Sequence, residues 1–184
     1  MKPTDQLKSE HEGIKLMLEI LSVVCAKLKS GQDLNQEHFT KMLEFLKVFV
    51  DKCHHGKEED LLFPAMEEAG VLKEDGPIGV MLMEHNQGRG YIKGMSEAFD
   101  RFKKEDRNAS AKIVENGESY IALLTQHIYK ENNVLFPMAD KVSSKTIQDD
   151  LEEEFEKLEV ERIGLGKHEE FHKLLHQLKE IYLD

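Results

Sequence analysis

The sequence predicts an all-α protein, an antiparallel up-down-up-down four-helix bundle with an additional C-terminal helical segment. Apolar residues recur at steps of three and four along most of the 184 residues, as on one face of a helix. Only four prolines interrupt the chain, and it contains no tryptophan. Charged residues make up 33% and hydrophobic residues 40%, a balance that suits a helical domain with one buried core.

Four segments carry narrow apolar stripes, and short polar stretches connect them. These segments are residues 4–30, 35–64, 77–102 and 108–138. Asn35 suits the cap of the second segment, Pro77 suits the first turn of the third, and Gly31 suits the end of the first. Pro64 and Pro137 are expected to end or kink the helices that contain them. Short connections place successive helices antiparallel, which predicts the bundle.

The chain changes in character after Val142. Residues 147–160 are rich in glutamate, Gly164 and Gly166 interrupt the pattern, and a second apolar stripe follows. We therefore expect one bent helix or two short helices packed on the bundle. The predicted organisation is a bundle of residues 1–142 and a C-terminal helical extension of residues 143–184, within a single domain.

Charge and cysteine content exclude several function classes. The formal net charge of −11 argues against nucleic acid and membrane surfaces as partners, because both require a basic face. No apolar run approaches the length of a membrane span, and the first residues lack the apolar core of a signal peptide. Cys25 and Cys53 are too few for a disulfide framework, so we expect a cytoplasmic protein with buried thiols. A redox role for Cys53, or a contact that supports the neighbouring His54, is the open alternative.

A repeated motif carries the candidate chemistry. Residues 54–64 read HHGKEEDLLFP and residues 127–137 read HIYKENNVLFP, so the shared Leu-Phe-Pro aligns His54 with His127 and Glu58 with Glu131. A His and a Glu four residues apart share one face of a helix. Neutral imidazole together with carboxylate suits iron, manganese or zinc rather than calcium.

His11 and His85 interrupt the apolar stripes of the first and third segments. At about 1.5 Å per residue, both lie at the height that the repeated motif reaches in an antiparallel bundle. Carboxylates are rarely buried without a compensating cation. We therefore predict a buried site for two metal ions with bridging glutamates. The predicted ligands are His11, His54, Glu58, His85, His127 and Glu131.

Three neighbouring features are left open. His55 and Glu59 lie one position round the helix and are expected to hydrogen-bond the ligands or face solvent, with Glu59 joining them only if the helix is distorted. Residues 168–172 read HEEFH, which matches the HExxH pattern of zinc proteases, but no substrate-binding domain accompanies it. We expect a capping helix with surface histidines there. The alternative is that His168 or His172 reaches the bundle site.

The six residues resemble the ligands of the hemerythrin-like (HHE cation-binding) domain family. A lone His on the first helix, HxxxE followed by LFP on the second and fourth, and His85 on the third carry this resemblance. It implies a centre of two non-haem iron ions with bridging solvent, in which the histidines ligate iron and Glu58 and Glu131 bridge. Oxygen-carrying members supply five histidines, whereas Met81 and Arg89 flank His85 here. We expect solvent, Glu59 or the C-terminal helix to fill that position.

The function implied by the resemblance is the binding or sensing of dioxygen or another small diatomic ligand, in a binding protein rather than an enzyme. Two alternatives remain open. One is a di-iron redox protein that handles nitric oxide, peroxide or iron in stress response or iron–sulfur repair. The other is a structural bundle that binds zinc. The sequence names no protein partner and no oligomeric state.

Overall fold

The computed structural model describes residues 1–184, and every regular element in it is a helix. The predicted all-α class is confirmed. The elements, with η for a π-helix, are α1 (Pro3–Lys29), α2 (Gln36–Glu44), η1 (Phe45–His55), η2 (Glu58–Leu62), α3 (Phe63–Glu68), α4 (Pro77–Lys103), α5 (Ala109–Lys130), η3 (Glu131–Leu135), α6 (Phe136–Val142), α7 (Lys145–Arg162) and α8 (Lys167–Tyr182). No helix combines the length and the apolar composition needed to cross a membrane.

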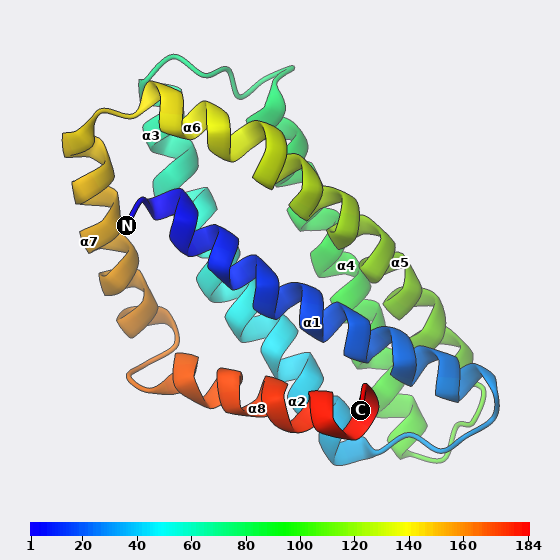
Figure 1. Ribbon diagram of the computed structural model, residues 1–184. Coiled ribbons are helices and arrows are strands. Elements are labelled where there is room, and N and C mark those ends of the chain that lie inside the picture. The colour runs from blue at the N-terminus through cyan, green and yellow to red at the C-terminus, as the bar shows by residue number, and fades with distance from the viewer.

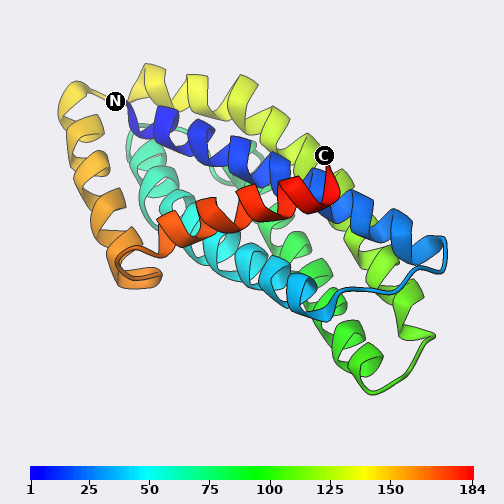
Figure 2. The same ribbon diagram turned by 60° about the horizontal axis from the view of Figure 1, so that its bottom comes forward.

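Long helical segments lie side by side in the body of the molecule. α5 packs along both α1 and α4, and η1, which continues α2, packs against α4 and α1 (Figure 1). The C-terminal helices cover one side of this body. Figure 2 shows α8 crossing over α1 and the α2–η1 segment, while α7 stands beside the start of α1. The extension thus packs on α1, η1 and η2.

Local sequence signals set most of the helix ends. The side chain of Asn35 accepts a hydrogen bond from the backbone N–H of His38 at 3.0 Å, as a helix cap does. Pro77 begins α4, where its missing N–H costs nothing. Gly31 follows α1 with φ +82°, a left-handed conformation that favours glycine.

The two repeated motifs contain π-helix, which the sequence did not predict. Hydrogen bonds in a π-helix join residues five apart, so each turn holds more residues and the side chains that follow are rotated relative to an α-helix. Pro64 and Pro137 each lie in the first turn of the α-helix that follows η2 or η3. A proline in that position does not break a helix. The chain therefore stays helical through both prolines.

Two apolar clusters lie on either side of one polar level in the core. On α1, Leu7 belongs to the smaller cluster and Ile14 to the larger, with His11 between them. On α4, Met81 and Ile92 are divided in the same way around His85. The extension contributes to both clusters, through Leu151 and Phe155 of α7 and through Phe171, Leu175 and Leu178 of α8. The polar level is thereby sealed by apolar packing along the helix axes.

Candidate metal centre

The structure brings all six predicted ligands into one buried group. They come from α1, η1, η2, α4, α5 and η3, one from each, and no side chain among them is more than 1% exposed. Nε2 of His11 lies 3.0 Å from Nε2 of His54, and Nε2 of His85 lies 3.0 Å from Nε2 of His127. The ring nitrogens therefore face one another in two pairs.

The side chains form two groups whose potential ligand atoms lie within 4.8 Å of one another. The first group is His11, His54, Glu58 and Glu131, and the second is His55, Glu58, His85 and His127. Glu58 belongs to both: its Oε1 lies 3.4 Å from Nε2 of His54 and its Oε2 lies 3.3 Å from Nε2 of His85. One carboxylate thus faces both groups.

Glu131 also spans the two groups. Its Oε2 lies 3.1 Å from Nε2 of His11, and its Oε1 lies 3.0 Å from Nε2 of His127. Like Glu58, it presents one oxygen to each group. Two carboxylates placed in this way can bridge a pair of neighbouring ions.

His55 is the member of the second group that the sequence prediction missed. It is 4% exposed, and its ring stacks on that of His85 at a centroid distance of 3.8 Å. In an α-helix, adjacent side chains diverge by about 100°. The π-helical turn of η1 holds more residues and therefore narrows the angle between His54 and His55, and both rings are buried. The signal in the sequence is the alignment of His55 with Ile128, an apolar residue that is itself buried.

Each of the four predicted histidines has an oxygen atom at its Nδ1. The pairs are His11 with Asn132 at 2.8 Å, His54 with Glu10 at 2.7 Å, His85 with Glu59 at 2.7 Å and His127 with Glu84 at 2.8 Å. Such a partner favours the tautomer that carries its proton on Nδ1, and it leaves the lone pair of Nε2 directed at the centre. Glu59 therefore contacts a predicted ligand, which was one of the three placements left open for it.

Several buried atoms of the centre have no hydrogen-bond partner. They are both carboxylate oxygens of Glu58, both of Glu131 and both ring nitrogens of His55. With protons on Nδ1, the Nε2 lone pairs of the facing histidines would repel at 3.0 Å. Buried carboxylates and opposed lone pairs are costly unless a cation lies between them. The donor set therefore fits two metal ions.

When no metal is bound, protons on the histidines compensate the negative charge of the buried glutamates. Burial opposes the charged form of His85, but the nearby carboxylates of Glu131 and Glu58 outweigh it and raise its pKa to about 11. The pKa of His127 rises to about 9, because the charge of Glu131 outweighs the same effect of burial. Burial holds the pKa of His55 well below its usual value, and repulsion from the charge of His85 adds a smaller effect in the same direction. His55 is therefore a neutral imidazole.

The HEEFH segment does not form a zinc-protease site. Glu169 is 75% exposed and pairs with Lys173 on the outer face of α8. His168 turns the other way, and its Nδ1 lies 3.0 Å from Oε1 of Glu159 on α7. His168 and Glu159 form, with Glu10, a third group of potential ligands outside the centre.

Both cysteines are buried packing residues. Burial raises the pKa of Cys25 to about 11 and that of Cys53 to about 12. A thiol with so high a pKa is a weak nucleophile at neutral pH.

Comparison with known proteins agrees with this geometry. The hemerythrin HHE cation-binding domain matches residues 2–139. Uncharacterized protein Mb2018 of Mycobacterium bovis is 25% identical over 160 residues, which are 87% of this chain and 62% of the relative. Iron-sulfur cluster repair protein YtfE of Enterobacter sp. is 35% identical over 88 residues, which are 47% of this chain and 40% of the relative. A YtfE of Salmonella typhimurium shows the same identity over 95 residues.

The chain spans less than two thirds of the length of each of these curated relatives. The family match, by contrast, covers most of the chain and includes every residue of the two ligand groups in the core. The chain belongs to the hemerythrin HHE cation-binding domain family.

Proposed function

We propose that this protein is a non-haem di-iron protein that binds or senses dioxygen or another small diatomic ligand. The observation that carries the proposal is the pair of buried glutamates, Glu58 and Glu131, each of which presents an unpartnered oxygen to each of two histidine groups. In this proposal an antiparallel up-down-up-down bundle of residues 1–142 holds the centre, and residues 143–184 cover it.

The two ions would have unequal ligands. His11 and His54 would hold one, while His55, His85 and His127 would hold the other. Bound ferrous ions supply electrons and an open coordination position for a diatomic ligand. The first group has one histidine fewer, so the open position is expected there.

The protein's own residues prepare the centre for such a ligand. The oxygen partners at Nδ1 fix the orientation of the four rings, so that no reorganisation is needed when an ion binds. Phe136 stacks on His11 at a centroid distance of 5.4 Å, and Phe63 stacks on His85 at 6.0 Å. These apolar rings exclude water from the face of the centre that they cover.

Metal analysis and spectroscopy test the proposal. Protein purified without chelator is expected to contain about two irons per chain, in keeping with a two-metal site. After anaerobic reduction, oxygen is expected to produce a charge-transfer absorption band that disappears on deoxygenation. Glu58→Gln should lose both the iron and the band, whereas Glu180→Gln, an exposed change of the same chemistry, should keep both. Zinc as the only metal would favour the structural bundle and contradict the proposal.

A second candidate function follows from the similarity to iron-sulfur cluster repair proteins over about half of this chain. In that case the centre would handle nitric oxide, peroxide or iron rather than reversibly bind oxygen. Turnover of nitric oxide by the reduced protein, absent from His54→Ala, would support this alternative. Irreversible oxidation of the iron by air would favour it over reversible oxygen binding.

A further inference from the structure

A carboxylate and a lysine support the metal-facing histidine of each repeated motif. In the first motif, Glu10 accepts hydrogen bonds from Nδ1 of His54 at 2.7 Å and from Nζ of Lys57 at 2.5 Å. Glu10 is itself the residue before the predicted ligand His11. All four side chains are buried.

The second motif repeats this arrangement. Glu84 precedes His85, and it accepts hydrogen bonds from Nδ1 of His127 at 2.8 Å and from Nζ of Lys130. Lys130 aligns with Lys57 in the repeated sequence. The two ligand groups therefore have equivalent support within the bundle.

The C-terminal helices make the two halves unequal. The side chain of Lys130 is 39% exposed, whereas Lys57 is fully buried and contacts Glu159 of α7. Nζ of Lys57 donates a second hydrogen bond, at 2.9 Å, to Oε2 of Glu159. The other oxygen of Glu159 lies 3.0 Å from Nδ1 of His168. We call Glu10, Lys57, Glu159 and His168 the outer chain.

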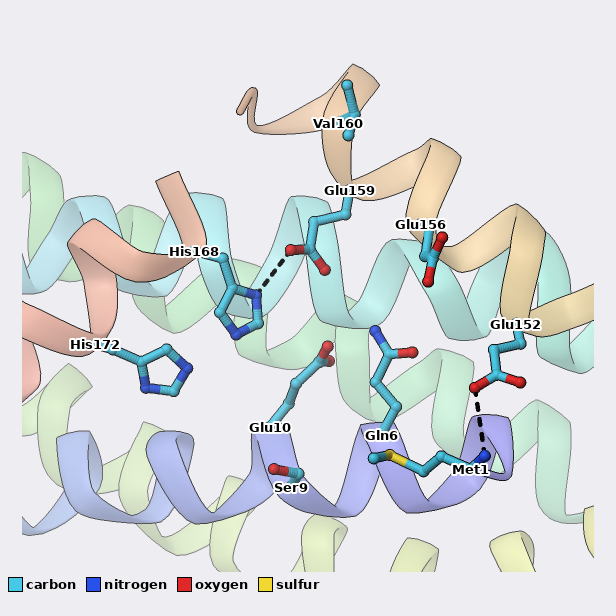
Figure 3. A pocket seen from close by; sticks show the side chains of 10 residues that line it. All are labelled: Met1, Gln6, Ser9, Glu10, Glu152, Glu156, Glu159, Val160, His168 and His172. Carbon is cyan, nitrogen blue, oxygen red and sulfur yellow. Dashed lines mark ion pairs between the residues drawn. The ribbon is translucent and has the colours of Figure 1, made fainter. Parts of the chain in front are cut away.

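The outer chain connects the centre with the surface. Figure 3 shows the carboxylates of Glu10 and Glu159 and the ring of His168 pointing toward one another across a pocket. This pocket has a volume of about 600 Å³, and Glu156 and His172 also line it. Contact with His168, against the effect of burial and together with Lys57, lowers the pKa of Glu159 to about 2. Glu159 is therefore a carboxylate at neutral pH.

We infer that Glu159 and His168 are positioning residues for the metal centre, which hold Lys57 in place and act through Glu10 on His54. The inference rests on the proposed metal-binding function. A buried ammonium requires compensating negative charge. Glu159 provides part of it, which leaves more of the charge of Glu10 to accept the proton of His54 and to strengthen Nε2 as a ligand.

The affinity for the ion held by His11 and His54 would therefore depend on residues outside the bundle. Both positioning residues lie beyond residues 2–139, the part of the chain that matches the family. Only the ion held by His11 and His54 would be affected, because the second motif has no counterpart of Glu159. The surface pocket would expose Glu159 and His168, the outer end of the outer chain, to solvent.

Calorimetric titration of the full chain with Co²⁺ tests the inference. The wild type is expected to bind two ions. Glu159→Gln should weaken one of them about tenfold, the lower end of the range for partners of metal-ligating histidines, and leave the other unchanged. Glu156→Gln removes a carboxylate from the same helix and the same pocket but not from the outer chain, so it should leave both affinities unchanged. Glu84→Gln should weaken the other ion.

A double-mutant cycle separates positioning from general loss of stability. Because Glu159 acts through Glu10, Glu10→Gln combined with Glu159→Gln should bind Co²⁺ no more weakly than Glu10→Gln alone. In the cobalt-loaded protein, Glu159→Gln should also shift one of the paramagnetically shifted imidazole N–H resonances and leave the others in place. Thermal unfolding of the metal-free variants gives the matched measure of stability.

Three results would overturn the inference. They are unchanged affinities in Glu159→Gln, equal weakening of both ions, and losses that add in the double variant. A wild-type protein that binds no Co²⁺ and contains no metal would instead refute the proposed function, and the inference would fall with it. The wild-type titration therefore distinguishes the two failures.

Discussion

At the scale of single residues, His55 is expected to lower the stability of the metal-free protein and to strengthen the proposed metal site. Both of its ring nitrogens are buried without a partner, which costs about 1–3 kcal/mol. We expect His55→Leu to stabilise the metal-free protein by that amount and to weaken the ion of the second group at least tenfold. Urea unfolding and Co²⁺ titration measure the two effects.

Ile128→Leu, at the aligned position of the second motif, is the matched control and should change neither quantity by much. A His55→Leu variant with lower metal-free stability and unchanged Co²⁺ affinity would show that His55 has only a packing role.

The protons of the histidines predict a pH dependence of the metal-free protein. The pKa values of His85, about 11, and His127, about 9, lie above their ordinary value of 6.5. Their stabilising contribution is therefore complete below pH 6.5 and is lost as pH rises through about 9 and then about 11. We expect the free energy of unfolding to fall between pH 7 and pH 10 in chelator-treated protein. A rise over this range would contradict the charge assignment.

Metal binding must displace the same protons. We therefore expect proton release on Co²⁺ binding at pH 7, and an affinity that falls as the pH is lowered. Calorimetry in two buffers of different ionisation enthalpy counts the protons directly. Identical heats in the two buffers would mean that the histidines are already neutral in the metal-free protein.

At the scale of helices, local signals predicted several helix ends but not the helical path through Pro64 and Pro137. Asn35, Pro77 and Gly31 act through their own side chains or backbone, and each lies where it was expected. The His-Glu pairs also fell correctly into the core, because residues four apart stay on one face. The π-helical turns have no such local signal. They adapt the helix to the packing around the centre, so the inward turn of His55 could not be predicted from its spacing.

Helix contact also predicts opposite effects at two glycines. A Cβ atom added at Gly117 of α5 would lie 2.8 Å from Sγ of Cys25 on α1, whereas one added at Gly90 of α4 would meet nothing within 4 Å. We expect Gly117→Ala to destabilise the protein by about 1–3 kcal/mol through overpacking. Gly90→Ala should stabilise it by about 0.5–1 kcal/mol through helix propensity. Urea unfolding of both variants measures the difference, and equal effects would contradict the close approach of α1 and α5.

At the scale of the whole molecule, the position of the proposed metal centre would couple metal binding to folding. The centre lies between the two apolar clusters, and all six of the helical elements that hold it also contribute to them. Buried charge without a cation opposes the packing of both clusters. A bound ion acts in the other direction, because its ligands are assembled only in the folded chain.

Glu58→Leu separates these two effects. The substitution removes a fully buried carboxylate at similar volume, and with it a partner of the protonated His85, so at pH 7 the metal-free variant should be less stable than the metal-free wild type. Co²⁺ at a hundred times its dissociation constant should stabilise the wild type by about 2.7 kcal/mol per ion and the variant by almost nothing. Thermal unfolding with Co²⁺ and with chelator gives all four values. A metal-free variant more stable than the metal-free wild type would mean that Glu58 is an uncompensated buried charge, and it would contradict the protonation of His85 at pH 7.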